Sequence, residues 1–291
     1  MKSFKTHNQQ LQILREKGLI ITNASRAKRI LERENYFSVI NGYRDLFALS
    51  TSPFRFIPGT TFDEIFSLYD LDRELKNLYL RYLLNIEKKF QTNVAYYFSK
   101  DNKRNNRAYL DFRNFRTPLN VRGWPTANGI HNTISMFSSK MSNEHNQALQ
   151  HYITNHQEVP FWVLVNTLTM GEIGYIYYYL KDSQRLDIAQ YYTKFRRQEY
   201  RQPSINITPN DIDTFLFFAK HFRNACAHNE RFYCKSSSRI NNIKTLRDKM
   251  KDFLTKRDYN AFIKTIDKLF QDYTGKFSSI SINQIKRKAG F

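Results

Sequence analysis

The stretch that decides the fold is residues 61–98, which read TFDEIFSLYDLDRELKNLYLRYLLNIEKKFQTNVAYYF. It begins with a capping box, because Thr61 precedes Glu64 by three residues at the start of an apolar run. Apolar residues then recur at the spacing that places them on one helix face: Ile65, Leu68, Leu71, Leu75, Leu78, Leu83, Ile86 and Phe90. This pattern predicts a long helix, or two helices in succession, that continues to about Phe98.

Most of the remaining chain has the same helical periodicity, and the alternation typical of strands is scarce. Only 9 Gly and 7 Pro are present among 291 residues, so few positions interrupt a helix. We therefore predict an all-α fold with many helices. Further helices are expected at 7–17, from 22 or 23 to 48, as two short ones within 126–155, at 183–196, from 208 onward, at 242–254 and at 257–273.

The chain divides by composition into four parts, which we expect to form one compact unit. They are an N-terminal helical region at 1–99, a basic loop or flap at 100–125, a helical region at 126–235, and C-terminal helices with a basic tail at 236–291. Within the first part, residues 50–59 contain two prolines and are expected to form a loop. In the third part, Gly171 and Gly174 allow a neighbouring helix to approach closely.

The charge balance points to a polyanionic partner. The chain carries 46 Lys and Arg against 26 Asp and Glu, a formal charge of +20. Nucleic acid is the first partner to expect and an anionic membrane surface the second. The basic residues are spread along the chain and do not gather on one amphipathic helix, which disfavours the membrane. No signal peptide or membrane-spanning apolar run is present, so we expect a cytoplasmic protein.

The helix that begins at Thr208 and Pro209 carries the candidate chemistry. Threonine is a favourable N-cap and proline suits a first turn, and Arg223, Asn224 and His228 lie near the far end of this helix. An imidazole can shuttle a proton near neutral pH. A guanidinium grips a phosphate through paired donors and offsets transition-state charge. These three residues are our candidate catalytic groups for cleaving RNA without a metal.

The Arg-x4-His pattern is a weak signal by itself, since roughly half a match is expected by chance from 23 Arg and 7 His in 291 residues. Asn224 and His228 are one helical turn apart, whereas Arg223 lies about 140° from His228 around the helix. That separation is awkward for one helix but suits two copies facing across a two-fold axis, so we expect a homodimer through this helix. A plainer interpretation stays open, in which His228 is a surface residue or makes an interface hydrogen bond.

Seven further residues are candidates for RNA contact, because they lie on the same helix, in the basic flap or in a basic pair: Lys220, His221, Arg231, Arg196, Arg197, Arg104 and Arg107. The tyrosines at 175 and 177–179 are able to stack on bases, although helix packing explains them more simply. No HExxH motif or Cys/His cluster is present, and Cys226 and Cys234 lack CxxC spacing. We therefore predict neither a metal nor a cofactor.

The motif at 223–228 resembles the signature of the HEPN superfamily of ribonucleases, which is Arg, a polar residue, three variable residues and His near the end of a long helix. More closely, the chain resembles the bacterial abortive-infection AbiD/AbiF family, and within it the AbiF branch. The likeness rests on four separated blocks at 36–43, 66–75, 160–171 and 222–231. Asn166 stands where many other members have Glu, which fits the AbiF branch.

The resemblance implies an all-helical fold of HEPN type and a role in phage defence, or as the toxin of a toxin–antitoxin pair. It also implies metal-independent endoribonuclease chemistry in a composite site shared by two protomers. A structured non-coding RNA is the implied partner, and it would restrain the activity. The alternative that rests on charge is a non-catalytic RNA-binding protein that uses the same basic surface.

Overall fold

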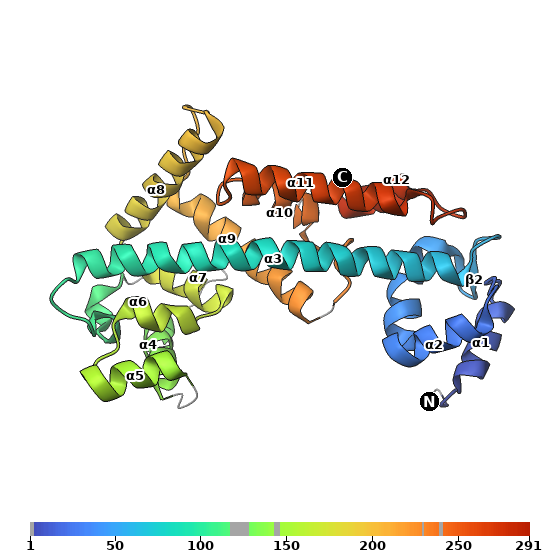
Figure 1. Cartoon of the computed structure of the whole chain (residues 1–291), viewed down its shortest axis with the longest axis horizontal. Coiled ribbons are helices and arrows are strands. Elements are labelled where there is room, and N and C mark those ends of the chain that lie inside the picture. Colours follow the sequence, from blue (N-terminus) through green and yellow to red (C-terminus); the bar gives the residue numbers. More distant parts are fainter. Residues whose placement is uncertain (1–2, 117–127, 143–145, 229, 239–240) are drawn as a thin grey trace. The chain divides into compact units, whose positions relative to one another are not determined.

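The computed structural model describes residues 3–116, 128–142, 146–228, 230–238 and 241–291 (Figure 1). The main helices are α1 (His7–Glu16), α2 (Ala24–Glu34), α3 (Phe62–Asp101), α4 (Asn128–Met141), α5 (Gln147–His156), α6 (Phe161–Leu164), α7 (Met170–Tyr179), α8 (Asp182–Tyr200), α9 (Pro209–Ala227), α10 (Ile243–Met250), α11 (Lys256–Thr274) and α12 (Ile282–Ala289). Short helical turns are η1 (Phe37–Asn41), η2 (Arg44–Phe47), η3 (Ala108–Leu110), η4 (Phe112–Asn114) and η5 (Val165–Thr167). The predicted all-α fold is confirmed.

Strands are confined to two small antiparallel pairs in the described part of the chain. One joins β1 (Ala48–Thr51) to β2 (Phe54–Phe56), and the other joins β3 (Ser236–Ser238) to β4 (Asn241–Asn242). A two-stranded pair is not stable alone, so each depends on the helices around it.

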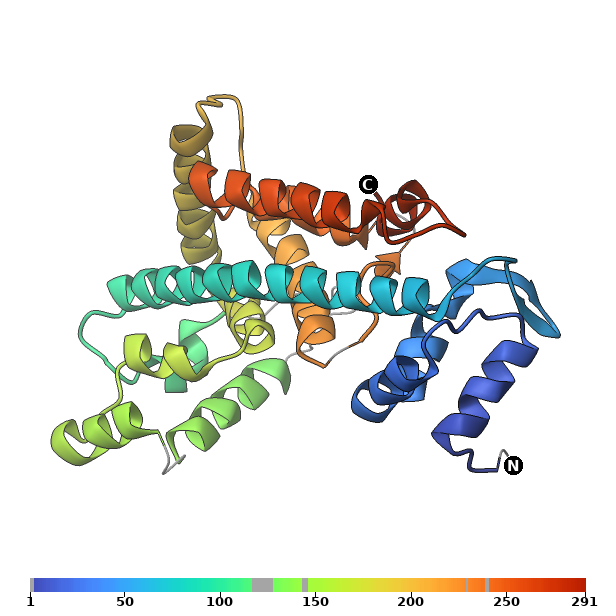
Figure 2. The same ribbon diagram turned by 45° about the vertical axis from the view of Figure 1, so that its right-hand side comes forward.

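Helix α3 is a single element of 40 residues and runs without a break (Figures 1 and 2). Its start is the predicted capping box: the Glu64 amide donates to Thr61 Oγ1 at 3.2 Å, and the Thr61 amide donates to Glu64 Oε2 at 2.9 Å. The alternative of two successive helices over 61–98 is therefore excluded.

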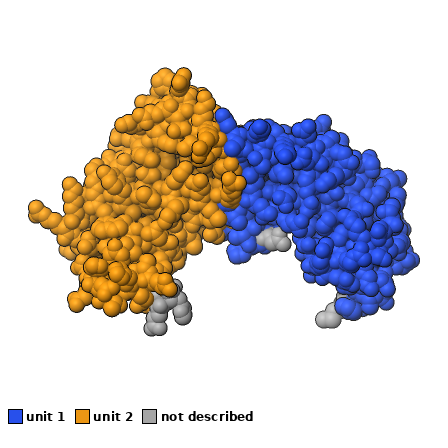
Figure 3. Space-filling model, viewed as in Figure 1, with its two compact units in different colours: residues 1–80, 224–245, 260–291 blue, residues 81–223, 246–259 orange. Residues whose placement is uncertain are grey.

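The chain forms two compact units, and both are assembled from segments far apart in sequence (Figure 3). Unit 1 comprises residues 1–80, 224–245 and 260–291, and unit 2 comprises residues 81–223 and 246–259. The boundaries fall inside four helices: α3 between Leu80 and Arg81, α9 between Arg223 and Asn224, α10 between Thr245 and Leu246, and α11 between Tyr259 and Asn260. The divisions predicted from composition, after residues 99, 125 and 235, do not coincide with these boundaries, because composition does not reveal that a helix can belong to two units.

The core of unit 1 centres on Tyr79 of α3, which is fully buried. Its ring meets Phe232 and Phe262 edge to face, at 5.0 and 4.9 Å between centroids. Its hydroxyl donates to the carbonyl of Ile243 at 3.0 Å. One α3 side chain thus gathers the segment after α9, the start of α10 and helix α11.

The core of unit 2 is built on the second half of α3. Phe90 meets Tyr177 of α7 edge to face and stacks on Tyr192 of α8, with centroids 5.4 and 6.0 Å apart. Phe215 of α9 stacks on Phe253 at 4.0 Å. Phe253 also lies 4.7 Å from the Tyr192 ring, so helices α7, α8 and α9 share one aromatic core with α3.

Three expectations about local structure were wrong. The second helix ends at Glu34 and not near 48, because Asn35 takes a positive φ of 67° that a helix does not accommodate. The expected loop at 50–59 contains most of the β1–β2 hairpin. The basic tail lies within α12, where Ser281 and Gln284 form a capping box. Residues 117–125 of the predicted flap lie outside the described residues.

Glu64 joins the start of α3 to the C-terminal segment within unit 1. Its Oε1 accepts the amides of Ser278 and Ser279 at 2.7 and 2.6 Å. Burial pushes the pKa of Glu64 up, but the hydrogen bonds from Ser279, Thr61 and Ser278 outweigh it, so the pKa lies below its ordinary value.

This depressed pKa predicts a specific loss of stability in acid. The stabilisation is complete above the pKa of an unfolded Glu, about 4.3, and is lost as the pH falls through the lower folded value. In urea unfolding, the free energy of the wild-type chain should therefore fall more steeply between about pH 6 and pH 3 than that of Glu64→Gln. Glu32→Gln, at a side chain 44% exposed, is the control and should retain the wild-type slope. Equal slopes for wild type and Glu64→Gln would contradict the prediction.

Candidate functional site

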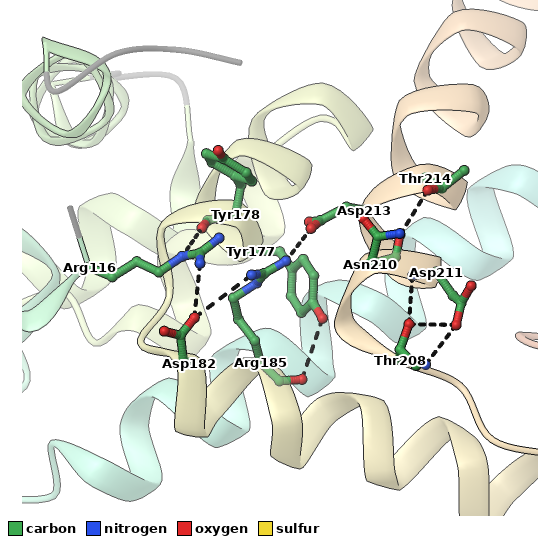
Figure 4. A network of polar contacts seen from close by, with 10 residues as sticks. All are labelled: Arg116, Tyr177, Tyr178, Asp182, Arg185, Thr208, Asn210, Asp211, Asp213 and Thr214. Carbon is green, nitrogen blue, oxygen red and sulfur yellow. Dashed lines mark hydrogen bonds and ion pairs between the residues drawn. The ribbon is translucent and has the colours of Figure 1, made fainter. Parts of the chain in front are cut away.

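Helix α9 is fixed at its N-terminus by the predicted cap. Thr208 Oγ1 accepts the Asp211 amide at 3.2 Å, and Asp211 Oδ2 accepts the Thr208 amide at 2.8 Å (Figure 4). The Asp211 carboxylate also lies where the helix dipole favours a negative charge. The helix therefore begins at one defined residue.

A buried ion pair holds the first turns of α9 against α8 (Figure 4). Arg185 of α8, with 8% of its side chain exposed, pairs with Asp213 of α9. The Arg185 guanidinium also lies 5.1 Å from the centre of the Tyr177 ring. Burial raises the pKa of Asp213, and the Arg185 charge opposes that rise. Removing either partner would leave a buried charge unpaired, so this pair fixes the direction of the helix.

A second arginine, Arg116, extends the same network to the end of the described residues 3–116. Arg116 donates from Nη1 to Asp182 at 2.9 Å and from Nε to the carbonyl of Tyr178 at 2.8 Å (Figure 4). Its own amide donates to the carbonyl of Tyr179 at 2.9 Å. The last described residue of the basic flap is thus anchored to α7 and α8.

Helix α7 packs closely on α9 through its glycines, as predicted. A Cβ at Gly171 would lie 3.0 Å from Cε of Lys220, and one at Gly174 would lie 3.6 Å from Cβ of Leu216. The Lys220 ammonium lies 4.6 Å from the centre of the Tyr175 ring and 3.1 Å from its hydroxyl. Lys220 is therefore held in place over an aromatic face.

Arg223 is positioned by a carboxylate from α3. Its Nε lies 3.5 Å from Oε2 of Glu87, and the two side chains are 24% and 9% exposed. Both of these atoms are buried, and neither makes a hydrogen bond with any described residue. Burial raises the pKa of Glu87, while the Arg223 charge and the Met170 amide oppose the rise. The guanidinium is thus oriented by charge, and part of the arginine side chain still reaches solvent.

Asn224 and His228 belong to unit 1. Asn224 is half-buried in the last turn of α9, and its carbonyl accepts the His228 amide at 2.9 Å. This bond extends the helical pattern one residue past Ala227, and the His228 side chain is exposed. An exposed imidazole at this position is available to a large substrate.

The segment that follows His228 is held by two groups of unit 1. Arg231 donates from Nη1 to the carbonyl of Gly42 at 2.8 Å and to Asp45 at 3.0 Å. Asp72 of α3, which is fully buried, accepts the amides of Phe232 and Tyr233 at 2.9 and 2.5 Å. The course of the chain beyond the motif is therefore tied both to the residues before β1 and to α3.

Asp72 is a residue that the sequence analysis missed. Its carboxylate also accepts the hydroxyl of Tyr43 at 2.6 Å. Burial raises the pKa of Asp72, and the hydrogen bond from Tyr43, the Phe232 amide and the charge of Lys76 oppose the rise. The signal was present in the sequence, because Asp72 and Lys76 are one turn apart on the otherwise apolar face of α3. Polar residues at core positions indicate a buried network.

The other predicted RNA-contacting residues differ in their surroundings. Arg196 is 4% exposed, donates to Asp252 at 2.9 Å and lies over the Tyr200 ring. It is an interior residue and is not available to a phosphate, which corrects the expectation from the basic pair. Arg197 is exposed and donates to the carbonyl of Ile205 at 2.7 Å. Arg104 and Arg107 are exposed, and His221 is partly exposed.

The tyrosines of α7 mostly serve packing. Tyr177, Tyr178 and Tyr179 are at most 5% exposed, whereas Tyr175 is 37% exposed. Cys226 is a buried free cysteine, and its burial raises the pKa of the thiol to about 12. Among the residues that the structure describes, no cluster of His, Cys, Asp and Glu has an arrangement able to hold a metal ion. No described helix is long and apolar enough to cross a membrane.

The hydrogen bonds to Asp72 predict that changing one atom of its side chain lowers the stability of unit 1 strongly. Asp72→Asn replaces an acceptor oxygen by an amide that faces N–H or O–H donors, so unit 1 should lose about 2 kcal/mol of stability. Urea unfolding followed by circular dichroism measures this. The matched variant Asp272→Asn, at an exposed position of α11, should change the stability by less than about 0.5 kcal/mol. Equal stabilities of the two variants would rule out the role assigned to Asp72.

Comparison with known proteins identifies the family. The model of the Abi-like protein family matches residues 29–234, which is more than half of the chain and includes α9 and the segment held by Asp72. Searches of curated proteins and of solved structures gave no match. The chain belongs to the family of Abi-like proteins.

Proposed function

We propose that this chain is a metal-independent endoribonuclease that acts in abortive infection, a bacterial defence against phage. The observation that carries the proposal is the contrast at the end of α9: a guanidinium held by a buried carboxylate and, five residues later, an exposed imidazole. A fixed cation suits transition-state stabilisation, and an accessible imidazole suits proton transfer. Family membership supports the defence role.

The reaction assigned to these residues is an internal transesterification. The ribose 2′-oxygen forms a bond to the adjacent phosphorus, and the bond from phosphorus to the 5′-oxygen breaks. The proton of the 2′-hydroxyl is taken by an imidazole, and a proton is delivered to the leaving 5′-oxygen. Arg223 offsets the charge on the phosphoryl oxygens, and Asn224 orients His228. The products are a 2′,3′-cyclic phosphate and a 5′-hydroxyl.

Two protomers complete the site in this proposal. One imidazole cannot act as base and as acid in the same step, whereas two copies supply one histidine for each role. A two-fold axis along the far end of α9 brings the same surface of both chains together. The exposure of His228 is compatible with such an interface.

RNA enters the proposal as both substrate and regulator. The candidate phosphate contacts are Lys220, His221, Arg231, Arg197, Arg104 and Arg107, and the buried Arg196 is left out. Within this proposal, the chain is related more specifically to AbiF-like proteins and to HEPN ribonucleases. That relationship implies a structured non-coding RNA that binds the protein and restrains its activity.

Cleavage assays test the proposal with matched variants. Purified protein in EDTA should cut a single-stranded RNA and leave the DNA of the same sequence intact, since DNA lacks the 2′-hydroxyl. His228→Ala should lower the cleavage rate at least about a hundredfold, while the affinity for RNA changes little. Arg223→Lys should also lose rate, because lysine lacks the paired donors of arginine.

His131→Ala provides the control, since His131 is an exposed histidine of α4. It should cut at the wild-type rate. Cleavage that disappears when EDTA is added, or DNA that is cut as readily as RNA, would contradict the proposal. Strong RNA binding with no cleavage by the wild-type chain would favour the rival function, a non-catalytic RNA-binding protein.

A further inference from the structure

A groove of about 700 Å³ lies within unit 2, between the C-terminal part of α3 and the segment α6–η5. Its lining includes the buried Ala95 and Val165 together with two large aromatic side chains, Tyr96 and Trp162. A volume of this size is typical of pockets that hold a small organic ring system. The groove is separate from the residues assigned to catalysis, since neither Arg223 nor Glu87 lines it.

Both aromatic side chains of the groove are well exposed. Tyr96 is 62% exposed and Trp162 is 49% exposed. A tryptophan or tyrosine that served packing alone would bury most of its ring. Both rings line the groove, so a flat partner that enters it meets two aromatic side chains.

The charge of the groove is positive. Lys100 and Lys103 lie in its lining, and no acidic residue does so among the described residues. Asp187 binds Lys100 at 3.2 Å but does not line the groove. Lys88, one turn from Thr92 of the lining, donates to Asn166 of the opposite wall. Such a surface attracts an anionic partner.

The groove also gives a role to a sequence block that the proposed mechanism does not use. In the block at 160–171, Phe161 and Leu164 are buried in the core, whereas Trp162, Val165 and Asn166 line the groove. The core requires the first two side chains. Core packing does not account for Trp162, which is half exposed and lies in the groove beside basic side chains.

We propose that this groove binds single-stranded RNA, with unpaired bases stacked on Trp162 and Tyr96 and the phosphates next to Lys100 and Lys103. Stacking on aromatic side chains combined with a basic groove is the usual chemistry of single-strand recognition. A duplex is excluded, because its bases are already stacked on one another and their faces are hidden. The inference shares with the proposed function the premise that the chain engages RNA, and it does not depend on cleavage.

Tryptophan fluorescence reads out the groove directly. The chain has two tryptophans, so Trp124→Phe leaves Trp162 as the sole reporter. In this background, with His228→Ala added to prevent cutting, an oligouridine of about 12 nucleotides should quench the emission. A duplex RNA of the same length should leave the emission unchanged.

Binding measured by fluorescence anisotropy supplies the second readout. In the His228→Ala background, Trp162→Ala should weaken oligouridine binding about tenfold, and Trp162→Phe should recover most of the loss because phenylalanine still stacks. The control is Phe37→Ala, which removes an aromatic side chain 70% exposed in unit 1. It should bind like the parent.

Three outcomes would overturn the inference. In the first, Trp162→Ala binds oligouridine with the affinity of the parent and the reporter is not quenched. In the second, duplex and single strand quench the emission equally. In the third, the emission depends on protein concentration in the absence of RNA, which would place a second copy in the groove. The cleavage assay is independent of these results. If His228→Ala still cuts RNA, the proposed function fails, whereas the groove is judged by quenching and anisotropy alone.

Discussion

Unit 1 depends on a carboxylate that has no access to water. Asp72 is fully buried in α3 and accepts hydrogen bonds from Tyr43, Phe232 and Tyr233, which lie 29, 160 and 161 residues away in the chain. A buried carboxylate is tolerated only when its oxygens are satisfied, so these three segments must meet at one point for the unit to fold. The blocks at 36–43, 66–75 and 222–231, which carry the family likeness, contain this group or adjoin it. The requirement to satisfy Asp72 therefore joins these blocks, and it also fixes the chain at Phe232 and Tyr233, after the motif.

The two ends of α9 differ in how their side chains are held by the rest of the chain. Its first turns are held by the Thr208 cap and by the buried pair of Arg185 with Asp213. Near its other end, Arg223 is held by Glu87, and His228 is exposed. A transition-state cation is effective when it does not have to reorganise, whereas a proton-transfer group has to reach the substrate and exchange protons. The arrangement meets both demands, and that is why we favour catalysis over simple binding.

Features that depend on a few neighbouring residues were predicted correctly from the sequence. The starts of α1, α3 and α9 were all predicted correctly, because a cap and an apolar stripe lie within a few residues of one another. The end of α2 at Glu34 was not, because no glycine or proline marks it and an asparagine takes the positive φ. The division into two units depends on contacts across the whole chain, and no local sequence pattern marks it. Arg196 was taken for a surface residue because its partner, Asp252, lies 56 residues away. Glu87 and Asp72 were not predicted, although both are polar residues among the apolar positions of α3, and such exceptions point to the groups that organise a site.

The two proposals rest on different residues and make the same demand on the RNA. Transesterification requires the 2′-oxygen, the phosphorus and the leaving 5′-oxygen to lie in line, which is the near-attack geometry that speeds such reactions. The regular A-form duplex holds its sugars and phosphates in one repeating geometry, whereas an unpaired strand can rotate its backbone into that line. In the proposed groove, Trp162 and Tyr96 would select unpaired bases for a separate reason, since only unpaired bases offer a free face. A groove that admits single strands and a site that cuts only flexible phosphodiesters therefore act on the same class of RNA. A compactly folded RNA, whose bases are paired and whose backbone is fixed, meets neither demand, so such an RNA can occupy the basic surface without being cut.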